Sequence, residues 1–185
     1  GGEKVDDVVD HPEFSQAARA MASWYDLQFE YPDELLIPDD ETGEQINISH
    51  MIPRSKADLL KRATGLTRIS ELSMGVMGRL PDYMNVTFAG FAANPSDWRG
   101  PNNENEQGAQ NIIDFQKRLR RNDLSLTHTI VHPVVDKAKD AIFAGNPVPL
   151  HKVGETKDSI IVRGARLLAT LAPFAEEQTV YPGHP

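Results

Sequence analysis

The stretch that decides the fold is "QKRLRRNDLSLTHTIVHP", residues 116–133, because its periodicity changes halfway along. The residues before Asn122 end the segment "EQGAQNIIDFQKRLRR", for which we predict a helix over residues 105–121. After Asp123, the run "LSLTHTIVHP" alternates and is rich in β-branched residues, which is typical of a strand. The sequence therefore predicts a mainly helical part before this point and a β part after it.

Upstream of the change, the first helix is predicted over residues 12–28. Its apolar side chains recur three and four positions apart, and Pro12 suits a first helical turn. Residues 31–53 follow, and they contain three prolines and the turn "DDETG", which indicates a loop with a weak hairpin. Residues 1–10 have few apolar side chains, and we expect a short extended piece there.

Two more helices are predicted between the loop and the change. Ser55 followed by Asp58 resembles a capping box, and periodic apolar residues predict a helix over 55–77 that ends near Gly78. Pro81 then fits the first turn of a helix over 81–93.

Downstream of the change, "SIIVRGARLLATLAP", residues 159–173, predicts two short strands around Arg163-Gly164. Runs of helices followed by runs of strands predict the α+β class, with segregated layers or two domains. We place an N-terminal helical domain at residues 1–122 and a β-domain at residues 123–185.

The composition limits the function classes. The chain has 185 residues, of which 39% are hydrophobic and 25% charged, and its formal net charge is −8. This charge argues against non-specific binding to nucleic acid or to anionic membranes, although local arginines can still hold small anions. The sequence has no cysteine, so disulfides and thiolate metal sites are excluded, and a reducing cytoplasm is the expected location.

Familiar cofactor and metal motifs are missing. His128 and His132 are four residues apart, but on a strand this spacing spans roughly 13 Å, too far for one metal ion. We therefore predict no metal site. Neither a P-loop nor a dinucleotide-binding glycine pattern is present.

The segment "MGRLPDYMNV", residues 77–86, places Arg79 and Tyr83 four positions apart in apolar surroundings. An arginine just before a helix and a tyrosine in its first turn can face one pocket. Together they could orient a phenolate, a carboxylate or a flavin edge. A surface arginine and an amphipathic core tyrosine explain the same spacing, and the residues alone leave both readings open.

Four segments of the sequence resemble one protein family. They are "DVVDHPEFSQAARAMASWYDLQ", "MGRLPDYMNVTFAGFAANP", "THTIVHPVVDK" and "IIVRGARLLATLAP". Together they are similar to the flavin-dependent phenol monooxygenases of the 4-hydroxyphenylacetate 3-monooxygenase type. The resemblance covers nearly all of this chain but corresponds to only the N-terminal part of the family's longer proteins.

This resemblance implies a fold and a set of site residues. The fold is acyl-CoA dehydrogenase-like, with a helical N-terminal domain and part of a β-barrel-like middle domain, and the family's C-terminal helical bundle is absent from this chain. The implied catalytic residues are Arg79, Tyr83 and His128. The implied cofactor contacts are Val134, Val135, Asp136, Lys137 and Thr170.

The resemblance also implies the chemistry. Members hydroxylate a phenol ortho to its hydroxyl with oxygen and reduced, diffusible FAD from a separate flavin reductase, and they assemble as homotetramers. His128 would act as the base, since histidine has a reference pKa of about 6.5, while Arg79 would stabilise the phenolate and Tyr83 would orient the substrate.

Several points stay open at the level of sequence. His132 stands where the family usually has Asn, and the loop around "RGPNNENEQG" looks longer than usual. The related 4-hydroxybutyryl-CoA dehydratase activity is not supported, because it needs cysteines. The substrate phenol is undetermined, and a truncated remnant with only a structural role is the alternative function.

Overall fold

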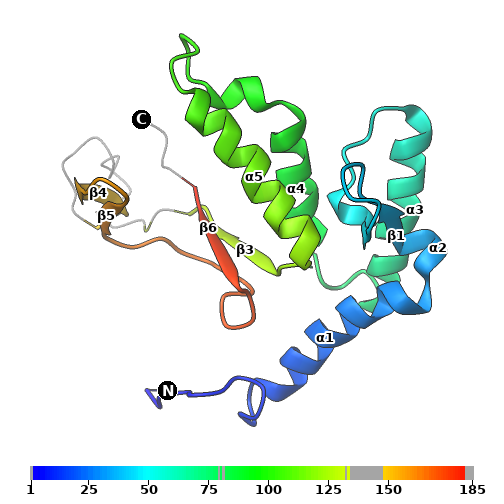
Figure 1. Cartoon of the computed structure of the whole chain (residues 1–185). Coiled ribbons are helices and arrows are strands. Elements are labelled where there is room, and N and C mark those ends of the chain that lie inside the picture. The colour runs from blue at the N-terminus through cyan, green and yellow to red at the C-terminus, as the bar shows by residue number, and fades with distance from the viewer. Residues whose placement is uncertain (1, 79, 81, 132, 134–147, 182–185) are drawn as a thin grey trace. The chain divides into compact units, whose positions relative to one another are not determined.

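The computed structural model describes residues 2–78, 80, 82–131, 133 and 148–181. Within them the chain divides into two compact units, residues 1–126 with 173–176 and residues 127–172 with 177–185. The first unit is mainly helical, whereas the second contains short strands (Figure 1). None of the helices in the described ranges is long and apolar enough to cross a bilayer.

The first unit begins with helix α1, Ser15–Glu30, which is followed at once by the short helix α2, Pro32–Leu35. Strands β1, Leu36–Pro38, and β2, Gln45–Asn47, then form the hairpin expected within residues 31–53. Of the extended piece expected at residues 1–10, residues 8–10 form a turn instead, and residues 2–7 form no strand. Bends and turns continue to Phe14, and the amides of Phe14 and Ser15 both donate to the carbonyl of His11.

Helix α3, Lys56–Leu72, begins as the capping box predicts. The hydroxyl of Ser55 accepts a hydrogen bond from the Asp58 amide at 3.1 Å, and the Asp58 carboxylate accepts one from the Arg54 amide at 2.9 Å. The helix ends earlier than the predicted Gly78. Met74 and Gly75 both have positive φ, which ends the helix, and the Gly75 amide donates to the carbonyl of Ser70.

Helices α4, Asp82–Ala93, and α5, Glu106–Asn122, pack side by side (Figure 1). Between them lies the 3₁₀ helix η2, Pro95–Trp98. The Asn105 side chain caps α5 by accepting from the Gly108 amide, and Asp123 ends it in the left-handed conformation. Both helices thus lie close to the predicted ranges.

The core of the first unit joins α1, the hairpin and α3. Its buried apolar side chains are Trp24, Leu27, Leu35, Ile37, Ile46, Ile48 and Ile69. Aromatic rings hold α4 against α5, since Phe88 contacts Phe115 with centroids 4.9 Å apart. These contacts stabilise the helices far more than their intrinsic propensities do.

A chain of buried polar side chains crosses the same unit. Asn85 donates to Ser49 at 3.0 Å, Ser49 to Asn47 at 2.7 Å, Asn47 to Gln28 at 3.2 Å and Gln28 to Asp123 at 2.8 Å. The first three bonds are buried and the bond to Asp123 is partly buried, and together they fix α1, α4 and the end of α5 relative to the 3₁₀ helix η1, Ile48–His50.

The second unit contains strand pairs. Strand β3, Leu126–Thr129, pairs with β6, Glu177–Val180, and β4, His151–Glu155, forms an antiparallel pair with β5, Ile160–Arg163. The predicted second strand after Arg163-Gly164 is wrong, because residues 165–171 form only isolated bridges there. Strands do follow residue 124, as the β-branched alternation predicts.

Candidate active site

Tyr83 lies in the first turn of α4, and the residue is 43% exposed to solvent. Its amide donates to the carbonyl of Leu80 at 3.1 Å, and its carbonyl accepts from the Thr87 hydroxyl, so the helix has begun at this point as expected. Arg79 lies outside the described residues. The pairing of Arg79 with Tyr83 therefore stays a prediction.

Asp82, the first residue of α4, is a polar group of the same block that the sequence reasoning passed over. Burial raises the pKa of its carboxyl to about 6. Hydrogen bonds from two backbone amides at the helix start lower the pKa, but their effect is smaller. A carboxyl with such a pKa beside a candidate substrate-orienting tyrosine is a feature typical of functional sites. The signal available in the sequence was an acid directly after a helix-starting proline.

The apolar side chains around α4 have different surroundings. Phe88 is buried, and Phe91 packs against both Phe88 and Trp98. Met74, in the turn after α3, is 87% exposed. It therefore forms no buried wall among the described residues.

His128 lies on β3, every residue of which is buried, and only 8% of His128 is exposed. The ring of Tyr181, just after β6, meets the imidazole edge-on, with centroids 6.1 Å apart and an interplanar angle of 85°. The strand prediction for His128 is confirmed. Its role as a base stays a prediction.

The predicted cofactor contacts are only partly within the described chain. Thr170 lies exposed in a turn that follows the bridged segment. Val134, Val135, Asp136 and Lys137 lie outside the described residues. Tyr83 belongs to the first unit, and His128 and Thr170 belong to the second. The convergence of the three remains a hypothesis.

A cavity of about 480 Å³ in the first unit contains none of the predicted site residues. Its charged lining is largely self-neutralised, since Lys117 pairs with Glu41 at 2.8 Å and Arg120 lies 3.6 Å from the same carboxylate. Such pairing leaves little net charge for a ligand. Across the described ranges, His, Asp and Glu side chains form no group of three that could hold a metal ion.

Fold similarity first defines the class of protein. The structure of an oxygen-tolerant archaeal 4-hydroxybutyryl-CoA dehydratase from N. maritimus superposes with a TM-score of 0.79 at 17% identity, over 96% of this chain and 36% of that one. At this identity the likeness concerns the fold alone. It agrees with the predicted α+β, acyl-CoA dehydrogenase-like class, which is confirmed.

Sequence similarity then gives the family. Residues 1–185 match the family described as "4-hydroxyphenylacetate 3-hydroxylase N terminal", and the chain belongs to it. The 4-hydroxyphenylacetate 3-monooxygenase oxygenase component of Geobacillus sp. (strain PA-9) is 38% identical over an alignment of 185 positions, which covers 98% of this chain and 36% of that protein.

A solved relative carries ligands. The structure of the oxygenase component (HpaB) of 4-hydroxyphenylacetate 3-monooxygenase, complexed with FAD and 4-hydroxyphenylacetate, superposes with a TM-score of 0.86 at 35% identity. The match covers 98% of this chain and 37% of that one. This chain thus spans little more than a third of the length of these relatives.

Proposed function

We propose that this chain is the N-terminal part of the oxygenase of a two-component, flavin-dependent phenol hydroxylase. The observation that carries the proposal is the match of all 185 residues to the family, together with a 35% identical relative whose structure holds FAD and 4-hydroxyphenylacetate. In this assignment residues 1–122 are the helical domain and residues 123–185 are part of the middle β-domain.

Three residues of this chain would each have a separate role in binding and activating the substrate. His128, on a buried strand, is screened from water and would accept the phenolic proton. The guanidinium of Arg79 would stabilise the resulting phenolate, and Tyr83 would orient the ring from the first turn of α4. A phenolate is a far better nucleophile than a phenol, so this proton transfer would favour productive hydroxylation.

FAD is the proposed cofactor, since solved relatives of this chain are complexed with it. Thr170 presents an exposed hydroxyl in a turn, and such groups can hydrogen-bond the edge of a flavin ring. The backbone and side chains of residues 134–137 would supply further contacts. When bound, reduced FAD would supply the electrons that activate oxygen.

The partners follow from the same assignment. Relatives named "oxygenase component" belong to systems whose other component is separate, and a flavin reductase is the partner that supplies reduced FAD. We place the complete protein in the cytoplasm as a homotetramer acting on a phenolic small molecule. Neither nucleic acid nor membrane is a partner in this proposal.

The test uses the complete oxygenase polypeptide with a flavin reductase, NADH, FAD and 4-hydroxyphenylacetate. Replacing His128 with Ala should lower hydroxylation by ~10²–10⁴, the usual contribution of one placed acid–base group, and should divert electrons to hydrogen peroxide. The exposed His151 provides the matched control, and His151→Ala should retain the parental product per NADH. Equal hydroxylation by the His128→Ala variant would refute the role of His128.

The same assay separates the enzyme from a structural remnant. If the complete polypeptide without substitutions binds FAD and hydroxylates the phenol, the hypothesis of a non-catalytic remnant fails. If it neither binds reduced FAD nor forms product with any of several phenols, the hydroxylase proposal fails.

A further inference from the structure

The strand that carries His128 contacts two other segments of the second unit. Strand β6 pairs with β3 on one edge, and the amide of Tyr181 donates to the carbonyl of Thr129 at 3.2 Å. The segment 165–171 contacts the chain just beyond the end of β3, where the Leu167 amide donates to the carbonyl of Val131 at 2.9 Å.

Two threonines of β3 bind the same segment. The hydroxyl of Thr129 donates to the carbonyl of Leu167 at 2.8 Å, and the hydroxyl of Thr127 accepts from the Leu171 amide at 3.4 Å. These two residues flank His128 in the sequence, so they point to the same face while His128 points to the other. The register between His128 and the segment carrying Thr170 is thereby fixed.

Arg166 contacts the ends of both β3 and β6. Its Nη1 donates to the carbonyl of Ile130, directly after β3, at 2.6 Å, and its Nη2 donates to the carbonyl of Tyr181, directly after β6. A guanidinium presents several donors in one rigid plane, so it can hold two carbonyls at once. One side chain thus ties the ends of both strands to the segment 165–171.

Gly164 explains how Arg166 reaches this position. Its φ is +114°, and a Cβ at this residue would collide with the carbonyl oxygen of Pro149. Only glycine accepts both constraints. The close approach of the two backbones sets the direction in which the chain leaves β5 and enters the segment that contains Arg166.

We propose that Arg166 is a positioning residue for His128. By holding the carbonyls of Ile130 and Tyr181, its guanidinium keeps the Tyr181 ring edge-on against the imidazole and fixes the distance from His128 to the Thr170 turn. We call the three residues Arg166, Ile130 and Tyr181 the clasp. Its effect on hydroxylation rests on the proposed function, whereas its effect on the position of the His128 ring does not.

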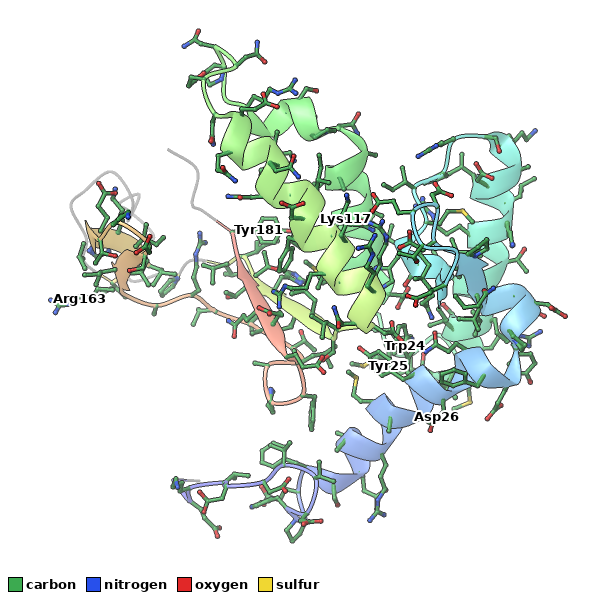
Figure 2. All side chains as sticks on the ribbon, in the orientation of Figure 1. Trp24, Tyr25, Asp26, Lys117, Arg163 and Tyr181 are labelled. Atoms are coloured by element: carbon green, nitrogen blue, oxygen red, sulfur yellow. The ribbon has the colours of Figure 1, made fainter. Side chains whose placement is uncertain are left out.

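The clasp is tested first without substrate. In the 185-residue chain, Arg166→Lys keeps the charge but loses the planar fork. The amides of Leu167 and Tyr181 should then exchange with solvent about ten- to a hundredfold faster, while those of α5 stay unchanged. The His128 ring resonances and their titration midpoint, followed by NMR, should also move. Arg163, exposed at the end of β5 (Figure 2), gives the control, and Arg163→Lys should change neither signal.

A positioning role is distinguished from a merely structural one by rescue and kinetics. In the complete oxygenase, Arg166→Ala should lose product per NADH and shift the pH profile of hydroxylation, with the KM for the phenol retained. Added guanidinium should restore part of both readouts, whereas added ammonium should not. Unchanged His128 resonances in Arg166→Lys, or a parental pH profile in Arg166→Ala, would overturn the proposal.

The two failures are separable. If the parental oxygenase forms no hydroxylated product, the proposed function fails, and the clasp is still decided by the His128 resonances and amide exchange. If the parental enzyme is active and Arg166→Lys leaves those resonances in place, only the clasp fails.

Discussion

Arg120 and Asp39, 81 residues apart in the sequence, form an ion pair in which Nε lies 2.7 Å from Oδ2 and the Asp39 side chain is fully buried. The Asp39 carboxylate also accepts hydrogen bonds from the amides of Glu41 and Thr42. The guanidinium of Arg120 holds the pKa of this carboxyl well below its usual range. The pair ties α5 to the β1–β2 hairpin.

The first prediction concerns this pair. Arg120→Met should destabilise the chain by up to about 3–5 kcal/mol, because the buried Asp39 carboxylate keeps only Arg121, whose Nε lies 3.6 Å from Oδ2, as a cationic neighbour. Arg54→Met is the control. Arg54 lies 3.4 Å from Asp40 in an exposed pair, whose loss should cost only about 0–1 kcal/mol. Urea unfolding of both variants measures the difference, and similar losses would contradict the assigned role of the pair.

The second prediction concerns His50, whose Nε2 lies 3.8 Å from Oδ1 of Asp123. Burial lowers the pKa of His50, although Asp123 opposes the shift, and Arg120 lowers it further. In the unfolded chain His50 therefore binds a proton as the pH falls through about 6.5, whereas in the folded chain it stays neutral at this pH. Stability should fall as the pH drops below about 6.5, with a slope of up to ~1.4 kcal/mol per pH unit from this group.

Unfolding by urea at pH 5 to 8 checks this dependence. His50→Phe should flatten the decline below pH 6.5, since it removes the titrating ring and keeps an aromatic volume in the core. The exposed His151 serves as control, and His151→Gln should keep the parental slope. An unchanged slope in His50→Phe would assign the acid sensitivity to other groups.

The third prediction concerns Asp82, whose shift has the opposite sign. With its pKa raised to about 6, the folded state holds a proton that the unfolded state releases near pH 4. Stability from this group is therefore lost as the pH rises through 6. Asp82→Asn should raise the free energy of unfolding at pH 7.5 by on the order of 1 kcal/mol, and much less at pH 4. Equal effects at both pH values would argue against a buried, titrating carboxyl.

The fourth prediction compares two helical glycines. A Cβ on Gly65 of α3 would lie 2.6 Å from Cγ2 of Ile48 and 2.8 Å from the backbone oxygen of Glu34. Gly65→Ala should therefore destabilise the chain by about 1–3 kcal/mol. Gly90 of α4 has open space at the same position, and Gly90→Ala should stabilise by about 0.5–1 kcal/mol. Thermal unfolding would show melting temperatures that move in opposite directions.

The fifth prediction concerns the remaining site residues in the complete oxygenase. Arg79→Lys should lower hydroxylation strongly, because an ammonium does not reproduce the planar fork of a guanidinium. Tyr83→Phe should have a milder effect, since it removes only one hydroxyl. Product formed per NADH is the measurement. Parental rates and coupling in Arg79→Lys would remove Arg79 from the site.

The sequence by itself determined the order of elements. The change from helical to β periodicity at Asn122-Asp123 marks the end of α5, and the capping box at Ser55 marks the start of α3. These signals act within one or two turns of chain, so they can be seen in a single sequence. The same locality misplaced the end of α3, since the apolar pattern continues beyond Leu72 while Met74 and Gly75 turn the backbone away.

Only the tertiary structure decided which distant residues meet. Asp39 reaches Arg120, Gln28 reaches Asp123, and Arg166 reaches the carbonyl of Ile130, over separations of 81, 95 and 36 residues. No spacing rule connects such partners. The contacts of Asp39 and Gln28 arise because a buried polar group must find a partner wherever the packing of the core brings one close, and that packing is a property of the whole fold. The bond from Arg166 to Ile130 is exposed, and it depends on where the fold places the segment 165–171.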